Sequence, residues 1–345
     1  MTKKALPVEN SDSNEQLALI ARLYYVDGLG QSEVAKLAGV SQAKISRLLS
    51  LAKERGIVRI SVTEYEPRVQ SLEAELKKRF SLDPAIVIKV PEGNQDDKLR
   101  ETVGYFGAPV IHGQLLANPV VAIAGGRTME ALIRNLPTTE AESMSVVQAM
   151  GNVDSILLPF DAQEIGRVTA QRMGGTFVSL NTPAFISEKR TRDALLNLEQ
   201  VQNVQETWSR SKIALVGIGT LDNSVFVERG TLTRSMHREL LNAGAVGELC
   251  GRFIDANGKE IQTQWRDCVV SIAIEQIKKI PLVLAVVSGS DRSEAIHAAI
   301  RGELIQGLLI DEHGARSLLE FDRTMVATNK TSAIPNRPAR KKATR

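Results

Sequence analysis

The chain has 345 residues, 43% hydrophobic and 24% charged, with a formal net charge of +3. This length predicts two domains with buried cores. An apolar run of about 20 residues, which a membrane-spanning helix needs, is missing from the sequence. Residues 1–14 lack the apolar core of an export signal, so we expect a disordered lead there and a cytoplasmic protein with no membrane partner. Cys250 and Cys268 are then expected to be reduced thiols.

The basic charge is concentrated at the two ends of the chain. Residues 1–63 have nine Lys and Arg against six Asp and Glu, and residues 330–345 have six basic residues and no acidic one. The middle of the chain is therefore acidic, which suits a DNA-binding head on a body that DNA repels. We interpret residues 330–345 as a disordered, solvated tail rather than a specific DNA contact.

Residues 15–66 have the pattern of a helix-turn-helix domain. Apolar residues at helical spacing predict a first helix over residues 15–27. Two further helices are predicted over residues 31–38 and 42–56, with Gly39 providing the sharp turn between them. The alternative interpretation is a three-helix packing unit that does not bind DNA.

The third of these helices is predicted to be the recognition helix, with Ser41 as its N-cap. Its outward polar side chains suit base edges and phosphates in the major groove, and the start of the second helix suits backbone phosphates. The predicted DNA-contacting residues are Gln31, Ser32, Ser41, Gln42, Lys44, Ser46 and Arg47. Residues 57–65 alternate like a β-strand, which predicts a winged helix-turn-helix.

Residues 67–84 are predicted to form a connecting helix. Val69, Leu72, Leu76 and Phe80 fall on one helical face. The segment is either the first helix packed onto the large domain or a coupling helix that pairs in an oligomer. The two interpretations are compatible, and the pattern does not choose between them.

Residues 85–329 are predicted to form a Rossmann-like α/β domain. Helical stretches alternate with short apolar runs at residues 85–90, 120–125, 145–151, 176–180, 213–219, 281–289 and 304–310. Several runs end in glycine and lead into a helix, which is typical of a parallel sheet covered by helices on both faces. Ligands of such folds bind at the carboxyl ends of the strands, so the loops there are candidate sites.

The loop after the second run is the first candidate, with residues Gly125, Gly126, Arg127 and Thr128. Glycines let backbone N–H groups approach an anion, and the helix that follows adds partial positive charge at its N-terminus. The loops at residues 217–220 and 288–292 have the same character, and the latter contains Arg292. Each glycine loop also has a purely structural interpretation.

The glycine-rich segment 244–259 contains three charged residues, Glu248, Arg252 and Asp255. Carboxylates in such a segment suit sugar hydroxyls, whereas the alternative is a structural turn with a hairpin tip. Spacing alone favours the structural interpretation for Glu248 and leaves Asp255 open. The sequence shows no catalytic triad, no metal-ligand spacing and no P-loop, so we predict no catalytic residue, metal or cofactor.

The chain resembles the SorC-type sugar-binding transcriptional regulators from about residue 15 to 325. The resemblance rests on six segments in order: YYVDGLGQSEVAKLAGVSQAKISRLLSLAKERGIVRI, VVAIAGGRTMEAL, VVQAMG, IALVGIGTL, GAVGELCGRFIDANGK and SGSDRSEAIHAAIRG. It departs from the family at Ser288, where a second glycine is common, at Arg292, where lysine is common, and in the basic tail.

This resemblance implies a large domain similar in fold to ribose-5-phosphate isomerase and glucosamine-6-phosphate deaminase. It also implies a homo-oligomer, a dimer or tetramer, that binds a palindromic double-stranded operator and is tuned by a phosphorylated sugar or polyol effector. The family pattern assigns Gly126, Arg127, Thr128, Glu248, Asp255 and Arg292 to the effector site, and favours an effector role for Asp255. With their neighbours, the predicted effector-binding residues are Gly125, Gly126, Arg127, Thr128, Glu248, Arg252, Asp255 and Arg292.

The predicted function is therefore regulation of a carbohydrate catabolic operon without enzymatic activity. The alternative is a sugar-phosphate isomerase or deaminase that retains the chemistry of the fold. Such an enzyme needs a positioned general base, for which Glu248 and Asp255 are the candidates.

Overall fold

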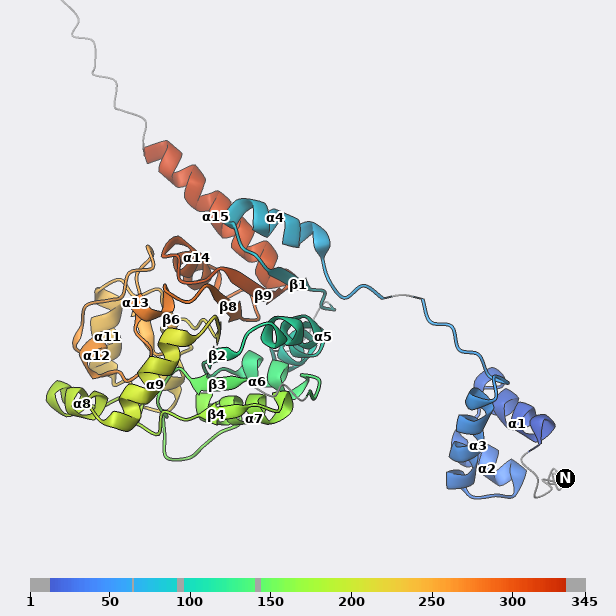
Figure 1. The fold of residues 1–345 in the computed structure, drawn as a ribbon. Coiled ribbons are helices and arrows are strands. Elements are labelled where there is room, and N and C mark those ends of the chain that lie inside the picture. Colours follow the sequence, from blue (N-terminus) through green and yellow to red (C-terminus); the bar gives the residue numbers. More distant parts are fainter. Residues whose placement is uncertain (1–12, 64, 92–95, 140–143, 333–345) are drawn as a thin grey trace, which may run out of the picture. The chain divides into compact units, whose positions relative to one another are not determined.

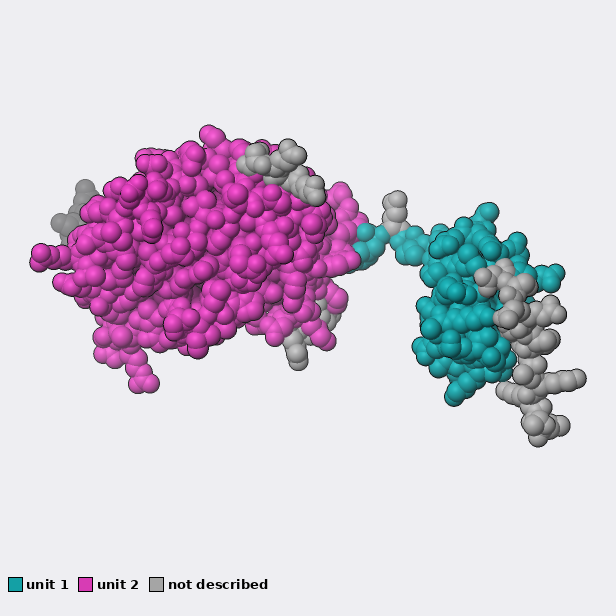
Figure 2. All heavy atoms as spheres, turned by 60° about the horizontal axis from the view of Figure 1, so that its bottom comes forward, with its two compact units in different colours: residues 1–65 teal, residues 66–345 magenta. Residues whose placement is uncertain are grey.

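The computed structural model describes residues 13–63, 65–91, 96–139 and 144–332. The chain divides into two compact units, residues 1–65 and residues 66–345 (Figure 2). Most of the predicted lead and of the predicted basic tail lies outside the described residues. The last helix continues to Ser332, so it includes the first three residues of the segment predicted as tail.

In its described residues, the first unit is built from three α-helices and a π-helical turn. Their bounds are α1 Asn14–Ala21, η1 Arg22–Val26, α2 Gln31–Ala38 and α3 Gln42–Glu54. Leu17, Ile45 and Leu48 are fully buried between the helices. Gly39 ends α2 in the left-handed conformation at a φ of 68°, and the Ser41 hydroxyl caps α3. The helix–turn–helix predicted from this spacing is therefore formed.

The strand predicted over residues 57–65 is not formed in residues 57–63. Ile60 is 58% exposed and Val62 is 81% exposed, so these apolar side chains face solvent rather than a core. A strand needs a neighbour to accept its hydrogen bonds. In the described part of this segment the chain does not fold back on itself, and no wing follows α3.

A seven-stranded parallel sheet forms the centre of the second unit (Figure 1). Its strands are β1 Ala85–Ile88, β2 Val120–Ile123, β3 Ser145–Gln148, β4 Thr176–Val178, β5 Ile213–Val216, β8 Leu282–Val286 and β9 Gly307–Asp311. Their order across the sheet is β1-β9-β8-β5-β2-β3-β4. Six strands lie within their predicted runs and β9 extends one residue beyond its run, which confirms the predicted sheet and its Rossmann-like α/β class.

Helices cover both faces of the sheet. One face packs against α5 Asp96–Leu116, α6 Arg127–Arg134 and α7 Ala162–Met173. The other packs against α4 Gln70–Phe80, α9 Glu199–Arg210, α13 Ile274–Ile277, α14 Ser293–Arg301 and α15 Glu312–Ser332. Side chains of a strand alternate between the two cores: Ile86 faces the first and Val87 the second. No helix in the described residues is long and apolar enough to cross a bilayer.

The remaining elements lie on the surface or beside the carboxyl ends of the strands. They are α8 Lys189–Leu196, α10 Val225–Glu228, α11 Arg234–Asn242, α12 Gln264–Cys268 and the antiparallel pair β6 Gly247–Leu249 and β7 Arg252–Ile254.

Helix α4 is packed onto the large unit, the first of the two interpretations of residues 67–84. Leu72 and Leu76 are buried in the core of the sheet face that also carries α15. Arg79 pairs with Asp322 on α15, and the Glu73 carboxylate accepts a hydrogen bond from the Val87 backbone N–H at 3.0 Å. These contacts fix the segment that enters the large unit, while its role in coupling stays a prediction.

Candidate ligand-binding site

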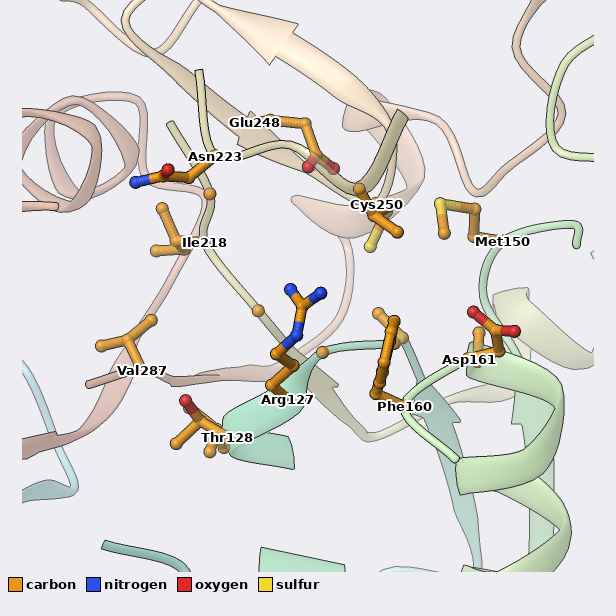
Figure 3. Close-up of a pocket in the computed structure, with 18 of the residues that line it drawn as sticks. Arg127, Thr128, Met150, Phe160, Asp161, Ile218, Asn223, Glu248, Cys250 and Val287 are labelled. Atoms are coloured by element: carbon orange, nitrogen blue, oxygen red, sulfur yellow. The ribbon is translucent and has the colours of Figure 1, made fainter. Parts of the chain in front are cut away.

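A cavity of about 130 Å³ lies at the carboxyl ends of β2 and β5 (Figure 3). The strands β2 and β5 are neighbours in the sheet. The next strand of the sheet along the chain lies beyond β2 for the first, where β3 is found, and beyond β5 for the second, where β8 is found. The loops leaving β2 and β5 therefore diverge, which is where ligands bind in open α/β sheets. The volume is roughly ten times what one buried water needs.

The floor of the cavity is backbone, because glycine allows two loops to approach each other closely. A Cβ on Gly125 would lie 2.9 Å from the Phe160 carbonyl oxygen, and one on Gly217 would lie 3.2 Å from the Gly125 carbonyl oxygen. Gly126 has a φ of 145°, and its N–H donates to the Phe160 carbonyl at 2.9 Å. A side chain at these positions would push the loops apart. Helix α6 thus begins at the cavity.

Arg127 and Thr128 are the first residues of α6, and both line the cavity. Figure 3 shows the Arg127 side chain reaching into the cavity. Its guanidinium lies 4.5 Å from the centre of the Phe160 ring and donates to the Glu228 carboxylate at 2.6 and 2.5 Å. The Thr128 hydroxyl hydrogen-bonds the Ser288 hydroxyl at 2.9 Å, which joins the first glycine loop to the third.

Arg292 lies at the N-cap of α14 and lines the same cavity. Its Nη1 donates to the Ser288 carbonyl and to the Asp291 carboxylate, both at 2.7 Å. The loop is held from below by the buried Asp311, whose carboxylate accepts a hydrogen bond from the Gly289 N–H at 2.6 Å. The guanidinium of Arg292 is therefore positioned by hydrogen bonds to residues of its own loop.

Glu248, on β6, places a half-buried carboxyl group at the cavity wall. Burial raises the pKa of Glu248, while hydrogen bonds from the Gly251 N–H, at 2.5 Å, and from the Ser224 hydroxyl lower it in part. Cys250 lies beside it, and burial raises the pKa of that thiol to about 12. The thiol is therefore protonated at neutral pH, and Glu248 is shifted toward its neutral form.

The structure does not bring Arg252 or Asp255 to this cavity. Arg252 is buried, and its guanidinium donates to the carbonyls of Ser271 and Ile272 at 2.9 and 2.7 Å. The Asp255 carboxylate accepts the N–H groups of Asn257 and Lys259, which closes its own hairpin tip. Of the predicted effector residues, the structure gathers Gly125, Gly126, Arg127, Thr128, Glu248 and Arg292 around the cavity.

Sequence reasoning missed the residues that the β3–α7 loop contributes. Phe160 and Asp161 line the cavity, and Asp161 pairs with Arg229, which follows α10. Met150 and Asn223 also line it. No local pattern marks this loop, because it reaches Gly125 only through the order of the strands, which places β3 next to β2.

The predicted DNA-contacting residues lie on α2 and α3. Gln42, Ser46 and Arg47 are exposed on α3, and Lys44 is half-buried. Gln31 is half-buried and Ser32 is exposed at the start of α2, and the Ser41 hydroxyl accepts the Lys44 N–H at 3.2 Å. The Ser41 side chain is therefore already used to cap the helix. In the described residues no cluster of three His, Cys, Asp or Glu could hold a metal ion.

Comparisons with known proteins agree with this architecture. Residues 67–320 match the family described as "Putative sugar-binding domain". The chain is 25% identical to the deoxyribonucleoside regulator of Bacillus subtilis (strain 168), over 88% of this chain and 97% of that protein. It is 26% identical to the sorbitol operon regulator of Klebsiella pneumoniae, over 91% of this chain and 100% of that protein.

The structure is also similar to the crystal structure of the full-length sorbitol operon regulator SorC from Klebsiella pneumoniae. The TM-score is 0.67 at 24% identity, covering 90% of this chain and 100% of that chain, and this likeness supports the fold. The resemblance predicted from the sequence is confirmed. Because the family model spans most of the chain, the protein belongs to the sugar-binding domain family, and its homologues are transcriptional regulators such as the sorbitol operon regulator and LsrR.

Proposed function

We propose that this protein is a DNA-binding transcriptional regulator whose operator affinity is set by a phosphorylated sugar or polyol. The observation that carries the proposal is the cavity at the carboxyl ends of β2 and β5, where the N-terminus of α6, three arginines and the half-buried Glu248 carboxyl group converge. A separate unit has the helix-turn-helix. Such a protein acts as a switch if the effector binds one of its arrangements better than the other.

The cavity offers donors for an anion and partners for hydroxyl groups. Arg127, Arg292 and the backbone N–H groups at the start of α6 suit a phosphate. Glu248 and Asn223, on the opposite wall, suit sugar hydroxyls (Figure 3). We assign the effector to this cavity. We leave Arg252 and Asp255 out of the assignment, because Arg252 binds the Ser271 and Ile272 carbonyls and Asp255 closes its own hairpin tip. A homo-oligomer on a palindromic operator remains part of the proposal.

A second candidate is a sugar-phosphate isomerase or deaminase, which Glu248, half-buried at the cavity wall and with a raised pKa, favours as a general base. Two observations weigh against it. The homologues are named as regulators, and the Glu248 carboxylate already accepts hydrogen bonds from Gly251 and Ser224. Incubating the purified protein with sugar phosphates and following the products by NMR separates the two. Turnover that an E248Q variant loses would establish the enzyme.

The regulator is tested with the full chain in two steps. DNA is first selected from a random double-stranded pool, and the Kd of the selected sequence is measured at fixed salt. Sugar phosphates and their unphosphorylated counterparts are then screened by thermal shift, where a ligand at 100 times its Kd adds about 2.7 kcal/mol. A hit should change the DNA Kd about five-fold or more. Selection of no sequence, or a hit that leaves the DNA Kd unchanged, would contradict the proposal.

Two variants locate the effector. Arg292→Ala removes a cation of the cavity and should abolish the thermal shift. Asp255→Ala removes a carboxylate of the same domain that does not line the cavity, so the thermal shift should persist. The reverse pattern would place the effector at the hairpin.

A further inference from the structure

The arginines that line the cavity are already paired with carboxylates. Arg100 pairs with Asp97 at 2.7 Å, Arg292 with Asp291 at 2.7 Å, and Arg127 with Glu228 at 2.5 Å. An anionic ligand that enters this cavity therefore competes with a side chain of the protein for at least one guanidinium.

The Arg127–Glu228 pair differs from the other two in its connectivity. Arg100 and Asp97 are three residues apart on α5, and Arg292 is the neighbour of Asp291, so these partners move with their arginine. Arg127 begins α6, whereas Glu228 ends α10, 101 residues further along the chain. This pair can separate without disturbing the loop that presents the arginine.

The Arg127–Glu228 pair is also open to solvent. The Arg127 side chain is 38% exposed and that of Glu228 is 52% exposed, whereas the nearby Asp161–Arg229 pair has 7% exposure on both sides. Exposed pairs are weak because water screens them and two long side chains must be ordered. Of these two pairs, the one that includes Glu228 is the easier to break.

The geometry at Arg127 suits an exchange of partners. Both hydrogen bonds to Glu228 use Nη2, so the carboxylate does not occupy the other N–H groups of the guanidinium. The guanidinium plane is held over the Phe160 ring at 4.5 Å, which keeps it in place when one partner leaves. A phosphate can take the same guanidinium with two hydrogen bonds.

We propose that Glu228 is an internal competitor of the effector, which holds Arg127 until an acidic group of the ligand replaces its carboxylate. This inference rests on the proposed function and specifies it. The ligand class is anionic, and ligand binding releases the end of α10. Glu228 thereby lowers the affinity for every anion and raises the ligand concentration at which the switch responds.

The test uses the full chain and inorganic phosphate, measured by calorimetry at constant pH and ionic strength. Glu228→Gln keeps the size of the side chain and removes its charge. We expect it to bind phosphate roughly two- to five-fold more tightly, the range that corresponds to losing one exposed ion pair. In a chain that already has Arg127→Gln, the same substitution should leave the Kd for phosphate unchanged, because the tighter binding depends on releasing Arg127.

Glu239→Gln is the matched control, because Glu239 is exposed on α11 and does not line the cavity. It should leave the Kd for phosphate unchanged. If it tightened phosphate binding as much as Glu228→Gln, the effect would come from the overall charge of the protein. If phosphate binds the wild-type chain and E228Q equally, the competitor is overturned while the proposed function stands. If phosphate binds neither protein, the competitor and the anionic effector class are both overturned.

Discussion

The Arg229 guanidinium and the Asp161 carboxylate form an ion pair, 2.8 Å from Nη2 to Oδ1, in which each side chain is only 7% exposed. Asp161 immediately precedes α7, and Arg229 immediately follows α10. The Arg229 guanidinium also lies 5.3 Å from the centre of the Phe160 ring. One buried pair therefore fixes the β3–α7 loop beside the cavity.

Removing Arg229 should destabilise the large unit strongly. Arg229→Ala leaves the Asp161 carboxylate buried without its cation, which costs about 3 kcal/mol or more. Trp208 and Trp265, the two tryptophans of the chain, both lie in the large unit, so their fluorescence in urea reports on its unfolding. Arg316→Ala is the control: its pair with Glu312 is exposed, at 59% and 24%, and its loss should cost about 0.5 kcal/mol or less. Equal losses for both variants would refute this interpretation.

Two glycines of α5 should respond oppositely to alanine. A Cβ on Gly104 would lie 2.4 Å from the backbone of Ala131 in α6, so Gly104→Ala must separate two packed helices and should cost about 2 kcal/mol. A Cβ on Gly113 meets nothing within 4 Å. Gly113→Ala should stabilise the unit by about 0.5–1 kcal/mol through helix propensity alone. Urea denaturation measures both. A G104A variant as stable as the wild type would contradict the prediction, because it would show that α5 and α6 can move apart without loss of stability.

Glu248 should make stability fall as pH rises. Burial raises the folded pKa of Glu248 above its ordinary value of 4.5, so the folded state binds the proton more tightly than the unfolded state. The stabilisation is complete below about pH 4.5 and is lost as pH rises through the raised pKa. The unfolding free energy of wild type relative to E248Q should therefore decrease from pH 4.5 upward. A difference that is constant between pH 4.5 and 8 would show that the pKa is not raised.

Arg47 should contribute to DNA affinity through a phosphate or a base. Arg47→Ala removes an exposed cation of α3 and should weaken binding about ten-fold, and loss of a phosphate contact would reduce the salt slope by about one. Lys53→Ala, at the far end of the same helix, is the control and should have a smaller effect. Anisotropy titrations with the selected DNA at several salt concentrations measure both. A larger loss for K53A would place DNA at the other end of α3.

The sheet could be predicted from the sequence because strands buried on both faces read as unbroken apolar runs. Residues 85–88 and 213–216 are fully apolar and buried, and β2 and β8 are fully apolar with only their first residue half-buried. The turn at Gly39 and the cap at Ser41 could also be predicted, since both depend only on residues close in the sequence. The glycine loop at Gly125 could be placed at the end of a strand for the same local reason.

The tertiary structure alone decided which side chains meet at the cavity. Phe160, Glu228 and Arg229 join Arg127 because the sheet places β3 and β5 on either side of β2, an order that no local pattern contains. Asp255 was expected at the site, but its carboxylate accepts hydrogen bonds from the backbone N–H groups of its own hairpin. The predicted wing failed for a related reason: alternation specifies one face of a strand, whereas a strand forms only where another segment supplies the hydrogen bonds.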